Sequence, residues 1–162
     1  GVRSTSGFDL IDDAALKVLI EMLFPLSNVV TPNILEAERI TGLRVQSEHD
    51  IEAAAGIMRS FGAKNVLIKG GHFEAWTGEK RVARDYLFIG DERTVFESEY
   101  FDTEATHGTG CTLAAAIAAN LGIGRDLAEA VSAAKKFVAK AIRSAPGLGH
   151  GHSPINIPNR AD

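Results

Sequence analysis

Apolar residues recur at helical spacing along much of the chain. The clearest pattern lies near the carboxyl end, where one apolar face predicts a helix over residues 126–144. That face comprises Leu127, Ala130, Val131, Ala134, Phe137, Val138, Ala141 and Ile142. Further helices are predicted over residues 12–23, 34–42, 48–62 and 110–121. Polar residues that can cap a helix stand at the starts of the first three. In the helix that ends at Gly62, the predicted buried face is Ile51, Ala54, Ala55, Met58 and Phe61.

Short apolar runs between these helices predict strands. Residues 29–30 and 66–68 are continuous apolar runs, and residues 86–89 and 94–96 predict a hairpin across the segment Gly-Asp-Glu-Arg. Alternating strands and helices with one hairpin predict an α/β fold, in which a largely parallel sheet carries helices on both faces. Ligands of such sheets bind beyond the carboxyl ends of the strands. Candidate chemistry is therefore expected at those ends.

Composition adds several exclusions to this picture. The chain has 45% hydrophobic and 23% charged residues, which is typical of a folded globular protein. Its net charge is −4 and it has no basic block, so we expect no nucleic-acid partner. One cysteine cannot form an intrachain disulfide, which favours a cytoplasmic location. The longest uncharged apolar run, residues 113–123, is too short to cross a bilayer, so we expect no membrane partner.

The strongest candidate for chemistry is the segment THGTGCT at residues 106–112, which leads into an Ala-rich helix. Its glycines let backbone N–H groups approach an anion, and the start of a helix adds partial positive charge. The first helical turn also favours the thiolate form of Cys111. Taken alone, the pattern fits equally well a glycine-rich turn with a small buried cysteine.

Asn33 and Glu36 form a second candidate site. They share one face of a predicted helix, and their oxygen atoms suit Mg²⁺ and its water ligands. The same spacing also makes a capping box, in which Asn33 caps the helix and Glu36 reaches back. The local pattern by itself favours the cap.

Two lysines complete the candidate set. Lys69 and Gly70 stand at a predicted strand end in the segment KGGH, where an ammonium group could meet a phosphate; alone, an ordinary strand-terminal lysine before a glycine turn is the simpler interpretation. At 100° per residue, Lys135 borders the apolar face of the last helix, whereas Lys136 lies nearly opposite that face. Lys135 can therefore border a cleft, and Lys136 is expected to be solvated.

Taken together, these segments resemble the hydroxymethylpyrimidine/phosphomethylpyrimidine kinases of thiamine biosynthesis, in the ribokinase-like superfamily. The chain contains the family's patterns TPNxxEA at residues 31–37, KGGH at 69–72 and THGTGCT at 106–112. Residues 149–156 are similar to its terminal GxGxGPxN. The order and spacing agree over essentially the whole chain.

The resemblance implies a three-layer α/β/α fold, ATP as co-substrate and a role for each motif. Cys111 would be the general base on the substrate hydroxyl, which belongs to hydroxymethylpyrimidine or its phosphate. The anion hole for the transferred phosphoryl group would comprise Gly108, Thr109 and Gly110. Lys69, Gly70 and Lys135 would contact or border the nucleotide. Asn33 and Glu36 would organise Mg²⁺.

Relatives in this family have further residues upstream. We therefore expect residues 1–162 to be the carboxyl-terminal portion of a single kinase domain, with the amino-terminal part missing, and the full-length protein to be a homodimer. A pyridoxal-type kinase shares the fold and remains an alternative. A catalytically silent nucleotide-binding fragment is another. A hydrolase with Cys111 as covalent nucleophile is disfavoured, because a kinase also explains Lys69, Asn33 and Glu36.

Overall fold

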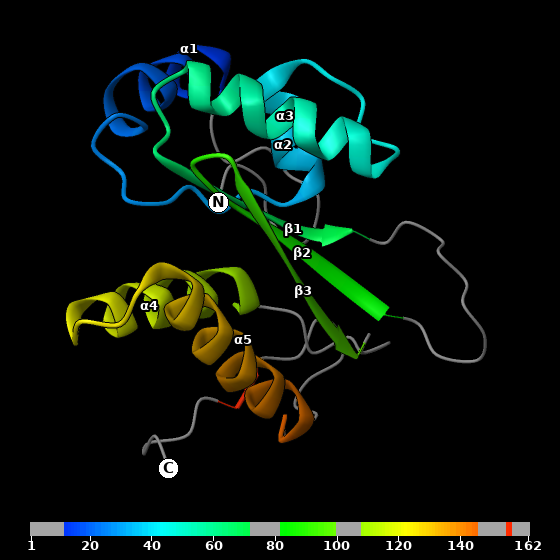
Figure 1. Ribbon diagram of the computed structural model, residues 1–162, viewed down its shortest axis with the longest axis vertical. Coiled ribbons are helices and arrows are strands. Elements are labelled where there is room, and N and C mark those ends of the chain that lie inside the picture. The colour runs from blue at the N-terminus through cyan, green and yellow to red at the C-terminus, as the bar shows by residue number, and fades with distance from the viewer. Residues whose placement is uncertain (1–11, 72–81, 100–107, 146–154, 157–162) are drawn as a thin grey trace. The chain divides into compact units, whose positions relative to one another are not determined.

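The computed structural model describes residues 12–71, 82–99, 108–145 and 155–156 of the chain (Figure 1). These residues belong to two compact units, residues 1–100 and 101–162. Each unit is described by itself below.

The helices of the first unit begin where the sequence predicts them. They are α1 (Asp13–Val18), which continues as the π-helical turn η1 (Leu19–Leu23), α2 (Ile34–Thr41) and α3 (Glu48–Ser60). Their caps are Asp12, Asn33 and Ser47, and each cap's side chain accepts a backbone N–H three residues on. Such bonds satisfy donors that have no acceptor inside the helix.

The sheet of the first unit is antiparallel. It comprises β1 (Asn65–Gly71), β2 (Val82–Ile89) and β3 (Glu92–Glu99), in the order β1-β2-β3. The predicted hairpin is confirmed, with a tighter turn in which only Gly90 and Asp91 separate the paired residues Ile89 and Glu92. The prediction of a largely parallel sheet is wrong for these described strands. A two-residue turn, and the short connection of residues 72–81, cannot supply the crossover that parallel neighbours need.

Within the described ranges, parallel pairing is found for the segment before α2. Val30 and Asn33 form parallel bridges to Val66 and Lys69 of β1. The N–H of Val30 donates to the carbonyl of Asn65 at 3.0 Å, and the N–H of Leu67 donates to the carbonyl of Val30 at 2.8 Å. Here α2 and α3 provide the long crossover, so the predicted strand at residues 29–30 is present as a short paired segment.

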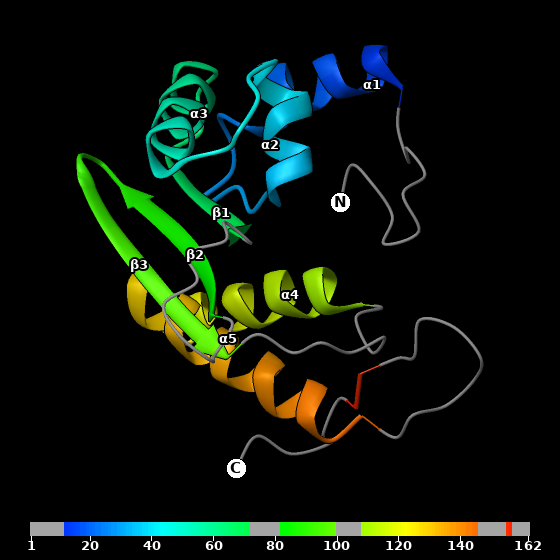
Figure 2. The ribbon, with the colours of Figure 1, turned by 90° about the vertical axis from the view of Figure 1, so that its right-hand side faces the viewer.

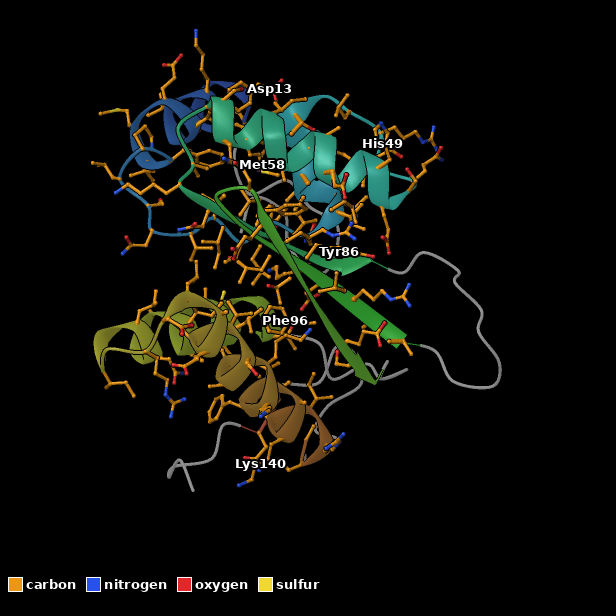
Figure 3. All side chains as sticks on the ribbon, viewed as in Figure 1. Asp13, His49, Met58, Tyr86, Phe96 and Lys140 are labelled. Atoms are coloured by element: carbon orange, nitrogen blue, oxygen red, sulfur yellow. The ribbon has the colours of Figure 1, made fainter. Side chains whose placement is uncertain are left out.

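The core of the first unit lies between its helices and one face of its sheet. In both views α2 and α3 lie over the same side of β1 (Figures 1 and 2). The buried cluster joins residues from those helices to alternate residues of β1 and β2, namely Ala37, Ile40, Ile51, Ala54, Ala55, Met58, Val66, Ile68, Tyr86 and Phe88. Figure 3 shows Met58 on the underside of α3 and Tyr86 on β2. Apolar burial of this kind is the main source of stability for the unit.

One member of the predicted α3 face does not join this core. Phe61 is 38% exposed, whereas Ile51, Ala54, Ala55 and Met58 are buried as predicted. The helix ends before Phe61, because Gly62 turns the chain with φ +100°. Phe61 therefore leaves the helical period that placed it on the buried face.

A cluster of charged and polar groups fixes the start of α3 to the hairpin. The hydroxyl of Tyr86 donates to Glu48 at 3.0 Å, and Arg93 contacts Glu52 at 2.7 Å. Burial of its ring raises the pKa of Tyr86, and the hydrogen bond to Glu48 raises that pKa further. The hairpin is thereby tied to the helix layer by polar contacts as well as apolar ones.

The described residues of the second unit form two helices, α4 (Thr109–Gly122) and α5 (Leu127–Arg143), which pack against each other. Asp126 caps α5, and the side chain accepts the N–H of Glu129 at 2.8 Å. The predicted apolar face of α5 is confirmed at its most buried positions, which are Ala130, Val131, Ala134 and Ala141. Both helices lie within two residues of their predicted bounds.

Candidate functional site

Asn33 and Glu36 form a complete capping box at the start of α2. The N–H of Glu36 donates to Oδ1 of Asn33 at 2.8 Å, and the N–H of Asn33 donates to Oε2 of Glu36 at 2.9 Å. Glu36 is buried, with 6% of its surface exposed. The capping interpretation from sequence is therefore confirmed. A carboxylate has further lone pairs, so this cap does not prevent Glu36 from also meeting a hydrated metal ion.

The fold brings this pair next to Lys69. Asn33 and Lys69 are bridge partners in adjacent parallel segments, and the N–H of Lys69 donates to the carbonyl of Pro32 at 2.9 Å. Two motifs that are far apart in the sequence thus meet at the carboxyl ends of neighbouring strand segments. This is the place where ligands bind in open α/β sheets.

Gly70 follows Lys69 in a conformation that favours glycine. Its φ is +77°, and the register of β1 against β2 shifts between Ile68 and Gly71. The N–H of Gly70 donates to Oδ1 of Asp85 at 2.8 Å, and Asp85 is buried, with 8% of its surface exposed. Sequence reasoning missed Asp85. The available signal was a lone carboxylate beside the apolar run of a predicted strand, where a charge is costly without partners.

The glycine-rich motif of the second unit forms the start of α4. Gly108 is the N-cap, with φ +84°, and Thr109, Gly110 and Cys111 occupy the first turn. The first backbone bond of the helix runs from the N–H of Thr112 to the carbonyl of Gly108 at 2.9 Å. The N–H groups before that bond have no acceptor within the helix, as in any helix start. Cys111 is exposed and its thiol is free of any disulfide, so the alternative interpretation of a small buried cysteine does not hold.

We expect Gly108→Ala to destabilise the chain by about 1–2 kcal/mol, because a left-handed conformation costs that much for a residue with a Cβ. A Cβ at Gly108 would meet nothing within 4 Å, so the loss would measure backbone strain alone. Urea unfolding of the chain would measure it. The matched control is Gly122→Ala at the other end of α4, where φ is ordinary and the space is equally open. That change is expected to be neutral or slightly stabilising, and equal losses at both positions would contradict the strain argument.

Lys135 lies on α5 in the same unit. It is half-buried, whereas Lys136 is exposed, as the helical geometry predicts. Neither Lys135 nor Thr109 is without an interaction partner. A position at the border of the apolar face is therefore established for Lys135, and its contact with a nucleotide stays a prediction.

The predicted site residues fall into two groups, one in each unit. Asn33, Glu36, Lys69 and Gly70 belong to the first unit, and the start of α4 with Lys135 belongs to the second. Several residues of the sequence motifs lie outside the described residues, including His72, His107 and residues 149–154. Within the described ranges, no group of three or more His, Cys, Asp or Glu could hold a metal ion.

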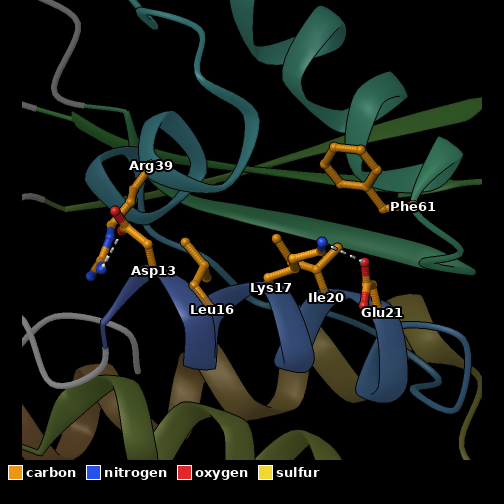
Figure 4. Close-up of a pocket in the computed structure, with 7 residues that line it drawn as sticks. All are labelled: Asp13, Leu16, Lys17, Ile20, Glu21, Arg39 and Phe61. Carbon is orange, nitrogen blue, oxygen red and sulfur yellow. Dashed lines mark hydrogen bonds and ion pairs between the residues drawn. The ribbon is translucent and has the colours of Figure 1, made fainter.

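A pocket of about 490 Å³ lies elsewhere in the first unit (Figure 4). It lies beside α1 and η1, and Asp13 at its edge contacts Arg39 at 3.2 Å. The lining residues are Asp13, Leu16, Lys17, Ile20, Glu21, Arg39 and Phe61. None of them is a predicted site residue, so this pocket is not the predicted phosphate site. Among the helices described, none is both long and apolar enough to cross a membrane.

The sequence comparisons agree on one enzyme family. A family model described as phosphomethylpyrimidine kinase matches residues 2–156. A hydroxymethylpyrimidine/phosphomethylpyrimidine kinase from Staphylococcus aureus (strain Mu50) is 45% identical over 152 residues, which is 93% of this chain and 54% of that protein. The chain thus spans about half the length of this curated relative.

The solved structures similar to the chain include those of two kinases. One is an ADP complex of Bacillus subtilis pyridoxal kinase, with TM-score 0.79 and 36% identity, covering 91% of this chain and 56% of that one. The other is a phosphomethylpyrimidine kinase from Clostridium difficile, with TM-score 0.70 and 36% identity, covering 87% and 54%.

Proposed function

Because this chain belongs to the phosphomethylpyrimidine kinase family, we propose that it supplies the phosphate-handling part of a kinase that acts on hydroxymethylpyrimidine and its monophosphate. ATP is the co-substrate and thiamine biosynthesis is the pathway. Residues 1–162 are the carboxyl-terminal portion of one kinase domain. The relatives support the assignment as a portion, because the chain spans about half of their length.

The start of α4 is the observation that carries this proposal. Its glycine N-cap turns the chain with φ +84°, and the exposed Cys111 stands in the first turn that follows. The N–H groups of Gly108, Thr109 and Gly110 form the anion hole for the transferred phosphoryl group. Cys111 accepts the proton of the substrate hydroxyl as general base. The chain's work in this reaction is positioning and charge neutralisation, with little covalent chemistry of its own.

The first unit contributes the groups that hold the nucleotide. Lys69 contacts the ATP phosphates as a cation, and the neighbouring Gly70 lets the backbone approach them. Lys135 of the second unit borders the nucleotide. Each lysine offsets part of the negative charge on the phosphates, which favours binding of the nucleotide.

A magnesium ion suits the residues present. Mg²⁺ keeps several waters and needs only one or two carboxylates when ATP phosphates supply its other ligands. The buried carboxylate of Glu36, with the amide of Asn33 beside it, fits that limited role. The bound ion would neutralise phosphate charge.

We expect Glu36→Gln to lower metal-dependent turnover of the full-length kinase while its stability is nearly unchanged. Glutamine keeps an oxygen that can accept the N–H of Asn33, so the cap survives and only the charge is lost. The matched variant Glu36→Ala removes both the charge and the cap, and is expected to cost about 1 kcal/mol of stability as well. Turnover against Mg²⁺ concentration and urea unfolding would separate the two effects. Unchanged turnover in Glu36→Gln would leave Glu36 with a capping role only.

The direct test of the proposed function is substrate-dependent ADP release by the full-length kinase that contains this chain. We expect release with hydroxymethylpyrimidine and with its monophosphate, and we expect it to require a divalent metal. Chelation by EDTA should abolish it, and added Mg²⁺ should restore it. No ADP release with either pyrimidine would contradict the proposal.

A pyridoxal-type kinase is the second candidate function. It is supported by the likeness of the chain to Bacillus subtilis pyridoxal kinase. The same ADP-release assay, with pyridoxal in place of the pyrimidine, distinguishes the two functions. A kcat/KM for pyridoxal above that for hydroxymethylpyrimidine would favour this second function.

A further inference from the structure

A buried carboxylate that has no role in the proposed chemistry lies beside the lysine motif. Asp85 stands on β2, and its Oδ1 accepts the N–H of Gly70 at 2.8 Å. Only 8% of its surface is exposed. Burial of a carboxylate is costly unless hydrogen bonds satisfy it, and the N–H of Gly70 supplies one such bond to Asp85.

The hydrogen bond stands where the backbone of β1 leaves its regular course. The ladder to β2 is regular from Asn65 to Ile68, and its register then shifts before Gly71. At Gly70 the backbone turns with φ +77°, while an added Cβ would meet nothing within 4 Å. The glycine is therefore needed for its backbone angle and not for lack of space.

The main chain around Lys69 is consequently held from two sides. The N–H of Lys69 donates to the carbonyl of Pro32 at 2.9 Å on the neighbouring parallel segment. The next N–H along the chain, that of Gly70, donates to Asp85 on the antiparallel neighbour. Two consecutive N–H groups are thus bound to opposite neighbours. These bonds fix the position of the Lys69 backbone, from which the side chain extends.

We propose that Asp85 is a positioning residue that holds the Lys69–Gly70 backbone in the conformation required for nucleotide phosphates. The inference rests on the proposed function, since it takes Lys69 as a phosphate contact. Asp85 acts through the Gly70 N–H and touches no reacting atom. Without this acceptor, the turn at Gly70 loses a hydrogen bond to β2, and the backbone from which the Lys69 side chain extends is held less firmly.

The test compares Asp85→Ala with Asp85→Asn in the full-length kinase. Alanine removes the acceptor, and we expect the KM for MgATP to rise about 10- to 100-fold, which corresponds to losing from nucleotide binding the free energy of one hydrogen bond to a charged group. Asparagine keeps an oxygen at the same place, and we expect a KM for MgATP within about threefold of wild type. The KM for hydroxymethylpyrimidine should stay within about twofold in both variants. A merely structural role would lower the melting temperature of Asp85→Ala and leave both KM values unchanged.

Two further variants make the result decisive. Asp91→Ala is the matched control, because Asp91 is an exposed aspartate in the turn of the same hairpin, paired only at 3.6 Å with Arg59; its KM for MgATP should not change. If Asp85→Ala fails to fold by circular dichroism, Gly70→Ala replaces it, since strain at φ +77° disturbs the same turn and should also raise the KM for MgATP.

An active wild-type kinase with an unchanged KM for MgATP in Asp85→Ala, or in its replacement Gly70→Ala, would overturn this inference alone. A KM in Asp85→Asn as high as that in Asp85→Ala would also overturn it, because the charge and not the acceptor would then matter. A wild-type kinase that releases no ADP would instead overturn the proposed function, and this inference with it.

Discussion

Replacement of Cys111 by alanine in the full-length kinase is expected to lower kcat about 10²- to 10⁴-fold, the usual contribution of a positioned general base. The side chain stands exposed in the first turn of α4, within the segment proposed as the anion hole. The KM for MgATP should change little, because the proposed anion hole consists of backbone N–H groups that alanine retains. Steady-state kinetics with hydroxymethylpyrimidine and ATP would measure both quantities.

Cys111→Asp separates a general base from a covalent nucleophile. A carboxylate can accept a proton, so a base role predicts more activity for Cys111→Asp than for Cys111→Ala. A nucleophile role predicts that both variants are equally inactive and that a substrate adduct forms on the wild-type thiol. Intact mass spectrometry during turnover would detect that adduct. Its presence would place the enzyme outside the proposed mechanism.

The 162-residue chain by itself is expected to have no measurable pyrimidine kinase activity, whereas kinases commonly turn over at about 1–100 s⁻¹. The chain spans 54% of its Staphylococcus aureus relative. The groups proposed to bind phosphate do not by themselves form a pocket for the pyrimidine. Weak ATP binding is still expected, since Lys69 and the start of α4 are both present. ADP release and equilibrium dialysis with ATP would test the two parts. Turnover near 1 s⁻¹ by the isolated chain would contradict its assignment as a portion of a kinase domain.

Local features of the fold could be predicted from the sequence because their causes are local. Asp12, Asn33 and Ser47 each cap a helix, and Gly42 ends one with φ +73°, in agreement with the pattern of polar starts and glycine stops. A cap needs only a side-chain oxygen within three residues of a free N–H, so residue spacing suffices to find it. The apolar face of α5 follows from helical period alone for the same reason.

Features that depend on distant partners could not be predicted in this way. The direction of β1 against β2 is set by the short connection between them, and a short apolar run such as residues 66–68 carries no information about its neighbours. Asp85 is paired with Gly70, fifteen residues away, and only the register of the two strands brings them together. The adjacency of Asn33 and Lys69 followed from the general rule on strand ends, but the bridge itself required the structure.

The order β1-β2-β3 makes β3 an edge of the described sheet, and its composition affects how the protein behaves at high concentration. An edge strand offers unpaired backbone groups to other chains, and charged side chains along it oppose edge-to-edge association. Along β3, Glu92, Arg93 and Glu97 are exposed, and Val95 is the only large apolar side chain described there with more than a third of its surface exposed. A second copy paired in parallel and in register would place each of these charges opposite itself, so β3 resists that form of the sheet extension from which amyloid-like aggregates grow.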